Sequence, residues 1–352
     1  MSSRNPWDEI ASHLHVSSRS IRRRSLPNGV AQLRLGCWLS LPSDFADRSR
    51  IQRRLFSHRA RLLSFARQHA DAHFTLHSAL ALHAIPTWRA CPEVNIRRQH
   101  SFCSHPFNAL TDPLIQLAEC RTRIERTSSL LEPLTLAAPF PATARVDSLE
   151  DTAIICAARL HPLEGFVAVC AILRRLCSFD RFALEESRQR EEAARARLLS
   201  LLAEKPLRNF ARAHAIISLA DAAAESVGER ALLWALLTVS PVRPETQCRW
   251  ELEGSVYFTD FFLAGERTVL EFDGAAKMGD NDIDFANSRR EQMERQLRLE
   301  RAGLRVLRYQ WRDFDSFDHL RALLCQHLSI GSTRLPSEHR RLWVPEPPRS
   351  FS

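Results

Sequence analysis

The stretch from Val256 to Gly274 reads Val-Tyr-Phe-Thr-Asp-Phe-Phe-Leu-Ala-Gly-Glu-Arg-Thr-Val-Leu-Glu-Phe-Asp-Gly. Two runs in which apolar residues recur at alternate positions flank the segment Ala264–Arg267, and this pattern predicts a β-hairpin. The Gly-Glu pair at its tip suits a two-residue type II′ turn, whose first central position favours glycine. A turn placed there pairs residues whose numbers sum to 531.

The predicted register gathers acidic side chains on one face of the hairpin. Asp260 stands directly opposite Glu271, and opposed residues have Cβ atoms roughly 4.5–5.5 Å apart. Asp273 points to the same face, because side chains alternate along a strand. Like charges so placed destabilise a sheet, so removal of one is expected to leave the unfolding midpoint unchanged or raised. A divalent metal is the simplest compensating cation, since hard cations bind clustered carboxylate oxygens.

The acidic pattern resembles the core of the PD-(D/E)XK nuclease superfamily. Its branch related to very-short-patch repair (Vsr-like) endonucleases often writes the second motif as Glu-x-Asp-Gly, which is the sequence of residues 271–274. The resemblance covers residues 210–328 and implies a restriction-endonuclease-like α/β core in the order helix, β-hairpin, helix, strand, helix. Further segments that carry it are Ser226–Glu229, Arg295–Gly303 and Val306–Asp313.

Two positions depart from that family pattern. The superfamily's usual lysine, two residues after the glutamate, is Asp273, and the branch's Arg-Glu pair on the following helix is Arg295-Gln296. Among 49 Lys and Arg residues only Lys205 and Lys277 are lysines. Lysine shifts its pKa readily when crowded, whereas arginine stays protonated. Lys277, four residues after the Glu-x-Asp motif, is therefore a candidate functional cation; chance placement on a solvated loop is the alternative.

The resemblance implies metal-dependent hydrolysis of a DNA phosphodiester. Asp260 and Glu271 would hold Mg²⁺ or Mn²⁺, which orients water and offsets charge in the transition state. Asp273 would be a third ligand or would orient a metal-bound water.

Four further side chains receive roles in this hypothesis. Glu229 would bind the metal through water or hold Lys277, and Lys277 would stabilise developing negative charge or position the nucleophile. Arg295 and Arg308 are candidate phosphate clamps, because guanidinium binds phosphate bidentately. The alternatives are a solvated helix residue for Glu229 and a strand-surface residue for Arg308.

Residues 1–59 carry 11 arginines against four acidic residues. The expected order is a helix over Trp7–Leu14, a serine-capped basic helix, an Asn-Gly turn and a β-ribbon over Val30–Leu41, which is typical of a winged helix-turn-helix. It is loosely similar to the N-terminal domain of AbiEi-type antitoxins. In the second helix Arg19, Arg22 and Arg23 would contact DNA phosphates or base edges. The alternative is a solvated arginine helix in a module that packs on the rest of the protein.

Residues 60–205 predict a mostly helical middle domain of unknown role. His69, His73 and His77 recur at four-residue spacing, and a polar helix face explains them better than a metal site. A capping-box-like start at Ser148 predicts a helix through Leu160.

Two segments after that helix are polar or proline-rich. The highly charged segment Ala183–Glu204 predicts a solvated helix, of the kind that can bridge two domains. The proline-containing tail over residues 331–352 is expected to be flexible.

Composition bounds the class of protein. The 352 residues are 45% hydrophobic, with a formal net charge of +8, which permits nucleic-acid binding. No apolar run approaches 18 residues and the first residues lack a signal core, so neither a membrane span nor a membrane partner is predicted. Nine scattered cysteines without a Cys-x-x-Cys pair favour reduced thiols and a cytoplasmic location.

The sequence therefore predicts a metal-dependent DNA endonuclease acting in repair, restriction or phage defence. One alternative is a DNA-binding regulator, or an antitoxin-like partner of a toxin or defence component, whose nuclease fold no longer cuts. RNA as the substrate is a third alternative, since phosphodiester chemistry does not reveal the sugar.

Overall fold

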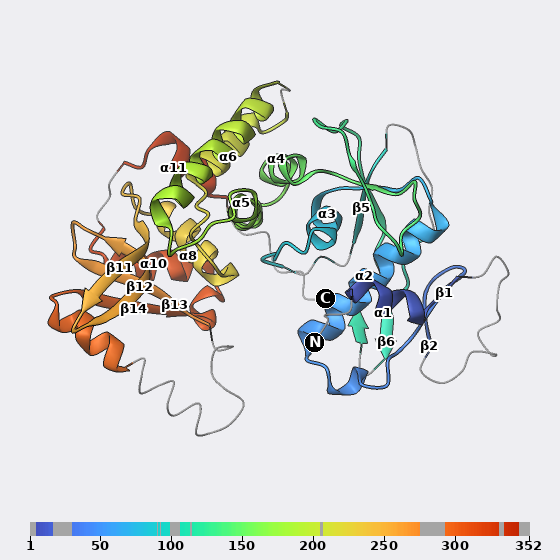
Figure 1. The fold of residues 1–352 in the computed structure, drawn as a ribbon, viewed down its shortest axis with the longest axis horizontal. Coiled ribbons are helices and arrows are strands. Elements are labelled where there is room, and N and C mark those ends of the chain that lie inside the picture. The colour runs from blue at the N-terminus through green and yellow to red at the C-terminus, as the bar shows by residue number, and fades with distance from the viewer. Residues whose placement is uncertain are drawn as a thin grey trace. The chain divides into compact units, whose positions relative to one another are not determined.

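The computed structural model describes residues 5–16, 30–89, 91, 93–98, 106–112, 115–204, 207–274, 293–330 and 334–344. The chain divides into two compact units, Met1–Ile155 with Ser350–Ser352 and Cys156–Arg349. Both units mix helices with strands, which confirms the expected α/β class at this level (Figure 1). The finer boundaries expected near residues 59 and 205 remain predictions.

The first unit is built around one long helix and three small sheets. Its elements are α1 (Pro6–His13), β1 (Leu14–Val16), β2 (Val30–Arg34), β3 (Cys37–Ser40), a 3₁₀ turn (Phe45–Asp47), α2 (Arg50–Gln68), β4 (His73–Phe74), α3 (Leu76–Leu82), β5 (Val94–Arg97), β6 (Leu110–Asp112), β7 (Ile115–Leu117), β8 (Thr122–Glu125), β9 (Leu134–Thr135), β10 (Arg145–Val146) and α4 (Leu149–Arg159). The sheets have the orders β1-β3-β2, β8-β5-β4-β10-β9 and β6-β7.

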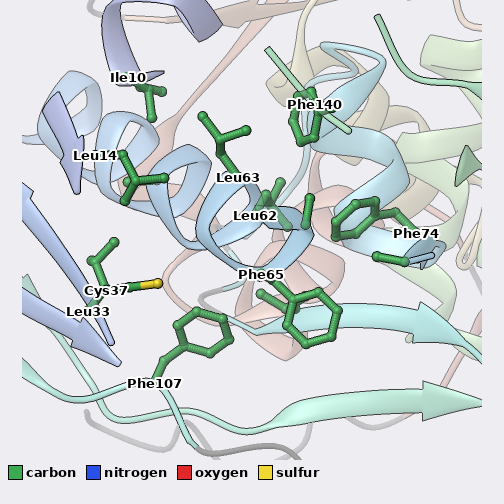
Figure 2. Packing of buried hydrophobic residues seen from close by; sticks show 14 of the residues in the cluster. Ile10, Leu14, Leu33, Cys37, Leu62, Leu63, Phe65, Phe74, Phe107 and Phe140 are labelled. Carbon is green, nitrogen blue, oxygen red and sulfur yellow. The ribbon is translucent and has the colours of Figure 1, made fainter. Parts of the chain in front are cut away.

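Helix α2 supplies the centre of the first unit's core. It begins at a capping box, in which Ser49 and Gln52 each bond the other's backbone N–H. Figure 2 shows Leu63 and Phe65 of α2 among the aromatic rings of the surrounding elements. The Phe65 ring lies 6.2 Å from that of Phe74 in an edge-on arrangement, which suits aromatic packing.

The N-terminal predictions are confirmed in part. Helix α1 agrees with the expected helix, and the ribbon expected over Val30–Leu41 is a hairpin of β2 and β3. It breaks at Gly36, whose φ of 77° is a left-handed conformation that glycine adopts without strain, and the neighbouring Leu35 is exposed. The expected basic helix lies outside the described residues, so the winged helix-turn-helix remains a prediction.

The predicted histidine face of one helix is wrong. His69 caps the end of α2, His73 lies in β4, and His77 lies in α3. His73 Nε2 instead lies 2.7 Å from Oδ1 of the fully buried Asp147. The four-residue spacing suggested a single helix, but spacing alone does not show where a helix ends, and a turn separates α2 from β4.

The capped helix predicted from Ser148 is confirmed as α4, and Ser148 Oγ accepts the Asp151 N–H at 3.1 Å.

The second unit combines a four-stranded sheet with helices. Its elements are α5 (Pro162–Leu176), α6 (Leu184–Glu204), α7 (Phe210–Leu219), α8 (Val227–Leu237), β11 (Glu245–Leu252), β12 (Ser255–Leu263), β13 (Thr268–Asp273), a helix over residues 293–301, β14 (Arg305–Gln310), a 3₁₀ turn (Trp311–Phe314), α10 (Phe317–His327) and α11 (Ser337–Leu342). The sheet order is β11-β12-β13-β14, antiparallel up to β13 and parallel between β13 and β14.

The predicted hairpin is confirmed with its register. Phe261 pairs with Leu270 and Leu263 with Thr268, so paired numbers sum to 531. The turn type differs from the prediction. The left-handed residue is Arg267, with φ of 47°, whereas Gly265 does not have the positive φ that a type II′ turn requires. The two strands leave the turn in the expected alignment all the same.

The predicted exposure of α6 is wrong, and the tail expected over residues 331–352 contains a packed helix. The charged helix α6 is not simply solvated, since Glu191 and Arg195 are buried and joined by an ion pair of 2.6 Å. Within the expected flexible tail, α11 buries Leu342, whose carbonyl accepts the indole N–H of Trp234 at 3.1 Å. The expected flexibility of residues 331–352 itself remains a prediction.

Candidate active site

Asp260 and Glu271 lie on neighbouring strands of the second unit. The paired register of β12 and β13 reaches Phe261 and Leu270, the residues next to Asp260 and Glu271. Asp260 Oδ2 accepts the backbone N–H of Phe272 at 2.8 Å, which fixes this carboxylate against β13 beside Glu271. Since the hairpin sets both positions, the arrangement follows directly from the sequence.

Two arginines neutralise Glu271, whose exposed fraction is only 8%. Arg295 Nη2 donates to Oε1 at 2.5 Å, and Arg308 Nη2 lies 3.5 Å from Oε2. Arg308 is also the neighbour of Glu271 in the parallel β13–β14 register. Two guanidinium groups therefore supply the positive charge beside Glu271 that was predicted to come from a metal ion.

Arg295 links this carboxylate to the next part of β12. It comes from the helix over residues 293–301 and also donates to the carbonyl oxygen of Phe258. The side chain is 32% exposed and that of Arg308 is 19% exposed. Both guanidinium groups are therefore partly accessible from the surface beside Glu271.

Asp273 and Glu229 occupy different surroundings. Asp273 ends β13, is partly buried and pairs in register with Gln310 of β14. Glu229 lies in the first turn of α8, which Ser226 caps, and its Oε2 accepts the N–H of Glu225 at 2.7 Å. This contact keeps the Glu229 carboxylate at the start of α8. Glu225 precedes α8 and pairs with Arg174 at 3.0 Å.

The start of α8 packs directly on the Glu-x-Asp strand. A Cβ on Gly228 would lie 2.0 Å from Cε1 of Phe272, so only glycine permits this approach. The Phe272 ring is held from other sides by Trp311 and Phe314, at centroid distances of 5.0 and 5.4 Å. The sequence motifs around Gly228 and Glu271 thus meet in space, and the glycine is a positioning residue that the sequence analysis did not single out.

The carboxylate oxygens at this site are the type of ligand that a divalent cation prefers, but their arrangement suits such a cation only in part. Asp260 and Glu271 offer hard oxygen donors on adjacent strands, as Mg²⁺ prefers. Within the described ranges, however, no three His, Cys, Asp or Glu side chains are gathered closely enough to hold a metal ion. A cation at Glu271 would have to compete with Arg295 and Arg308 for the carboxylate oxygens.

Four of the predicted site residues lie outside the described residues. They are Lys277 and the three arginines of the expected basic helix, Arg19, Arg22 and Arg23. Their assigned roles stay predictions.

Sequence reasoning missed a cavity of about 940 Å³ beside α6 and β11. Its wall includes Arg188, which bonds Glu191 at 2.6 Å and Asp221 at 2.9 Å, and Arg243, which lies 3.3 Å from Asp221. The charges of these side chains pair with one another, so they stabilise the wall. The sequence feature that could have indicated this charged wall is the spacing of Arg188, Glu191 and Arg195, which puts them along one face of a helix.

Comparisons of the chain with protein-family models, with curated proteins and with solved structures found no match. Among the described residues, every helix is too short or too polar to cross a membrane.

Proposed function

We propose that the second unit is a metal-dependent DNA endonuclease acting in the cytoplasm, with the candidate site on β12, β13 and β14. The observation that carries the proposal is the convergence of Asp260, Glu271, Arg295 and Arg308 at neighbouring positions of these strands and the adjacent helix. Paired carboxylates with flanking guanidinium groups suit a phosphodiester, because they offer both a cation site and phosphate donors. The strand order and the resemblance of residues 210–328 to PD-(D/E)XK nucleases support the same proposal.

In this proposal Asp260 and Glu271 hold Mg²⁺ or Mn²⁺, with Asp273 as a further oxygen donor. The bound ion supplies positive charge to the scissile phosphate and its attacking water. Arg295 and Arg308 bind the phosphate oxygens, which releases Glu271 from its two guanidinium partners when the substrate arrives. Glu229 keeps the first turn of α8 in place beside β13, and Lys277 remains the candidate for stabilising developing charge.

A DNA-binding regulator with an inactive nuclease fold is the second candidate. The pairing of Glu271 with two arginines favours it, because a carboxylate whose charge is already compensated needs no metal. In that case Arg295 and Arg308 form part of a DNA-contacting surface, and a toxin or another defence component is a suitable protein partner.

Incubation of the purified protein with supercoiled, linear and single-stranded DNA in Mg²⁺, Mn²⁺ or EDTA tests the first proposal. We expect cleavage that requires metal and falls roughly 100-fold or more in Asp260→Asn and in Glu271→Gln. Glu251→Gln is the matched control, because Glu251 is an exposed acidic residue of the same sheet, 69% exposed, and should cleave as the wild type does.

The two candidates give different results in this experiment. Absence of cleavage by the wild type, together with DNA binding that weakens with salt, supports the regulator. Cleavage that persists in both site variants contradicts the proposed site, and cleavage of RNA in preference to DNA would change the substrate class alone.

A further inference from the structure

An aromatic ring stands exposed beside the candidate site. Phe182, in the connection between α5 and α6, has an exposed fraction of 75%, the highest among large apolar side chains of the described residues. Its ring lies 5.4 Å from that of Phe258 at an interplanar angle of 82°. The guanidinium carbon of Arg181 lies 5.2 Å from the centroid of each ring. We call Arg181, Phe182 and Phe258 the aromatic platform.

The platform is held in place by local contacts. The Phe182 N–H donates to Oδ1 of Asp180 at 2.9 Å, and the Asp180 N–H donates to Ser187 Oγ at 3.0 Å. Arg181 Nη1 lies 3.6 Å from Oε2 of Glu225. A rigid turn therefore presents the Phe182 ring to solvent, so a ligand that stacks on it meets a preorganised surface.

A short series of contacts joins the platform to the catalytic carboxylate. Phe258 lies two residues before Asp260 on β12, and its carbonyl oxygen accepts from Arg295. The same guanidinium donates to Glu271 at 2.5 Å. A nucleotide whose phosphate contacts Arg295 would therefore have its base within reach of Phe258 and Phe182.

We infer that the aromatic platform stacks a nucleobase that is not base-paired, so that the substrate presents a single-stranded or unpaired nucleotide at the site. This inference rests on the proposed function. Every base has a π-face that stacks on an aromatic ring, and such stacking contributes about 1–3 kcal/mol per base. Bases inside a duplex have both faces covered by their neighbours, and extruding one from the stack has an energetic cost.

Charge complementarity selects a nucleic acid over an apolar protein surface as the occupant. The guanidinium group of Arg181 lies against both rings, and that of Arg295 bonds the carbonyl oxygen of Phe258, so guanidinium groups and aromatic rings alternate along this series of contacts. Arginine also stacks on bases and binds phosphate bidentately. A polyanion with flat apolar groups matches this alternation.

The test measures binding in EDTA, so that it does not depend on cleavage. Oligonucleotides with a central 2-aminopurine, single-stranded or in a duplex, are titrated with the wild type and with Phe182→Ala, Phe182→Trp and Phe210→Ala. Phe210 is the matched control, an exposed phenylalanine of α7 in the same unit. Circular dichroism checks that each variant is folded.

We expect Phe182→Ala to weaken single-strand binding about 5- to 150-fold, the equivalent of one stacked base, and to abolish the 2-aminopurine quenching. Phe182→Trp and Phe210→Ala should bind as the wild type does, and duplex affinity should not change. Equal single-strand binding and quenching in the wild type and Phe182→Ala would overturn the inference while the cleavage experiment still decides the nuclease proposal. A change of sedimentation mass in Phe182→Ala, with single-strand binding intact, would also overturn it, since the surface would then join protein chains.

Discussion

At the scale of single residues, Glu271 shows what the sequence could and could not predict. The position of Asp260 and Glu271 on adjacent strands, next to the paired residues Phe261 and Leu270, was predictable because a hairpin register is local and set by its turn. The partners of Glu271 were not, since Arg295 and Arg308 lie on later elements whose approach depends on tertiary packing. Both arginines were predicted as phosphate-binding candidates, and the structure places both of them against Glu271.

Replacing Glu271 tests whether these arginines stabilise the fold. We expect Glu271→Gln to lower the free energy of unfolding by about 1–3 kcal/mol, because two partly buried guanidinium groups lose their counter-charge. Urea unfolding measures this, with Glu251→Gln, an exposed pair with Arg249, as a control that changes stability by less than about 1 kcal/mol. Carboxylate repulsion alone predicts the opposite sign for this change in the free energy of unfolding. An unchanged or raised stability would therefore favour a metal ion as the partner of Glu271.

His58 gives the first unit a dependence on pH. Burial, followed by the charge of Arg61, lowers the pKa of His58 in α2 from 6.5 to about 4. A depressed folded-state pKa means that the unfolded chain binds the proton more readily, so His58 contributes stability fully above pH 6.5 and loses it as the pH falls toward 4. We expect a loss of up to about 3 kcal/mol across that range, at 1.36 kcal/mol per pKa unit.

Urea unfolding at several pH values measures this loss. His58→Gln should remove this part of the pH dependence, whereas His15→Gln, which alters an exposed histidine of β1, should retain it. A profile that is identical in all three proteins would contradict the assignment to His58.

At the scale of elements, the hairpin and the helices α1, α4 and α6 were predictable from periodicity and caps, but burial was not. Ser187, Glu191, Arg195, Leu198 and Leu202 form one buried face of α6 that mixes charged with apolar residues. A charge-rich helix is usually solvated, and the pattern of charge alone gives no sign of a partner such as Asp221 on a later segment. The cost of burying these charges is offset because each forms an ion pair, either along the helix or with Arg188.

The contact between α8 and β13 predicts an unusual response to alanine. In an open helix Gly→Ala stabilises by roughly 0.5–1 kcal/mol. Gly228→Ala should instead destabilise by about 1–3 kcal/mol, because the new Cβ would overlap the Phe272 ring, which Trp311 and Phe314 hold. Thermal unfolding checks this against Gly265→Ala, whose Cβ meets no atom within 4 Å.

A double variant separates steric overlap from a general helix effect. When Phe272→Ala is already present, adding Gly228→Ala should no longer reduce stability. An undiminished loss in that background would show that the Phe272 ring is not the cause.

At the scale of the whole molecule, positive charge is unevenly distributed between the units. The first 59 residues carry an excess of seven positive charges out of the chain's +8. The candidate phosphodiester site, in contrast, lies in the second unit. A protein so built would bind DNA through its basic N-terminal segment, while the second unit would cut the DNA or stack one of its bases. The salt dependence of DNA affinity tests this division of roles.

The triple variant Arg19→Ala, Arg22→Ala, Arg23→Ala should weaken DNA binding and reduce the slope of log affinity against log salt by up to about 3, at roughly 0.9 per phosphate contact. The matched control removes the same charge from three exposed arginines near α11: Arg334, Arg340 and Arg341. Fluorescence anisotropy over a range of salt concentrations measures both slopes. Equal slopes in the two triple variants would show that net charge, not the N-terminal segment, governs binding.

The burial of α11 has a practical meaning for anyone who modifies this protein. The Trp343 ring lies 5.8 Å from that of Trp234 and 3.8 Å from the guanidinium carbon of Arg321, so the segment that follows α11 packs on α8 and α10. Truncation of the chain after α10 would remove the side chains that pack on α8, and the first turn of α8 packs on the Glu-x-Asp strand. Affinity tags and fluorescent fusions are therefore better appended beyond residue 344 than substituted for the last twenty residues.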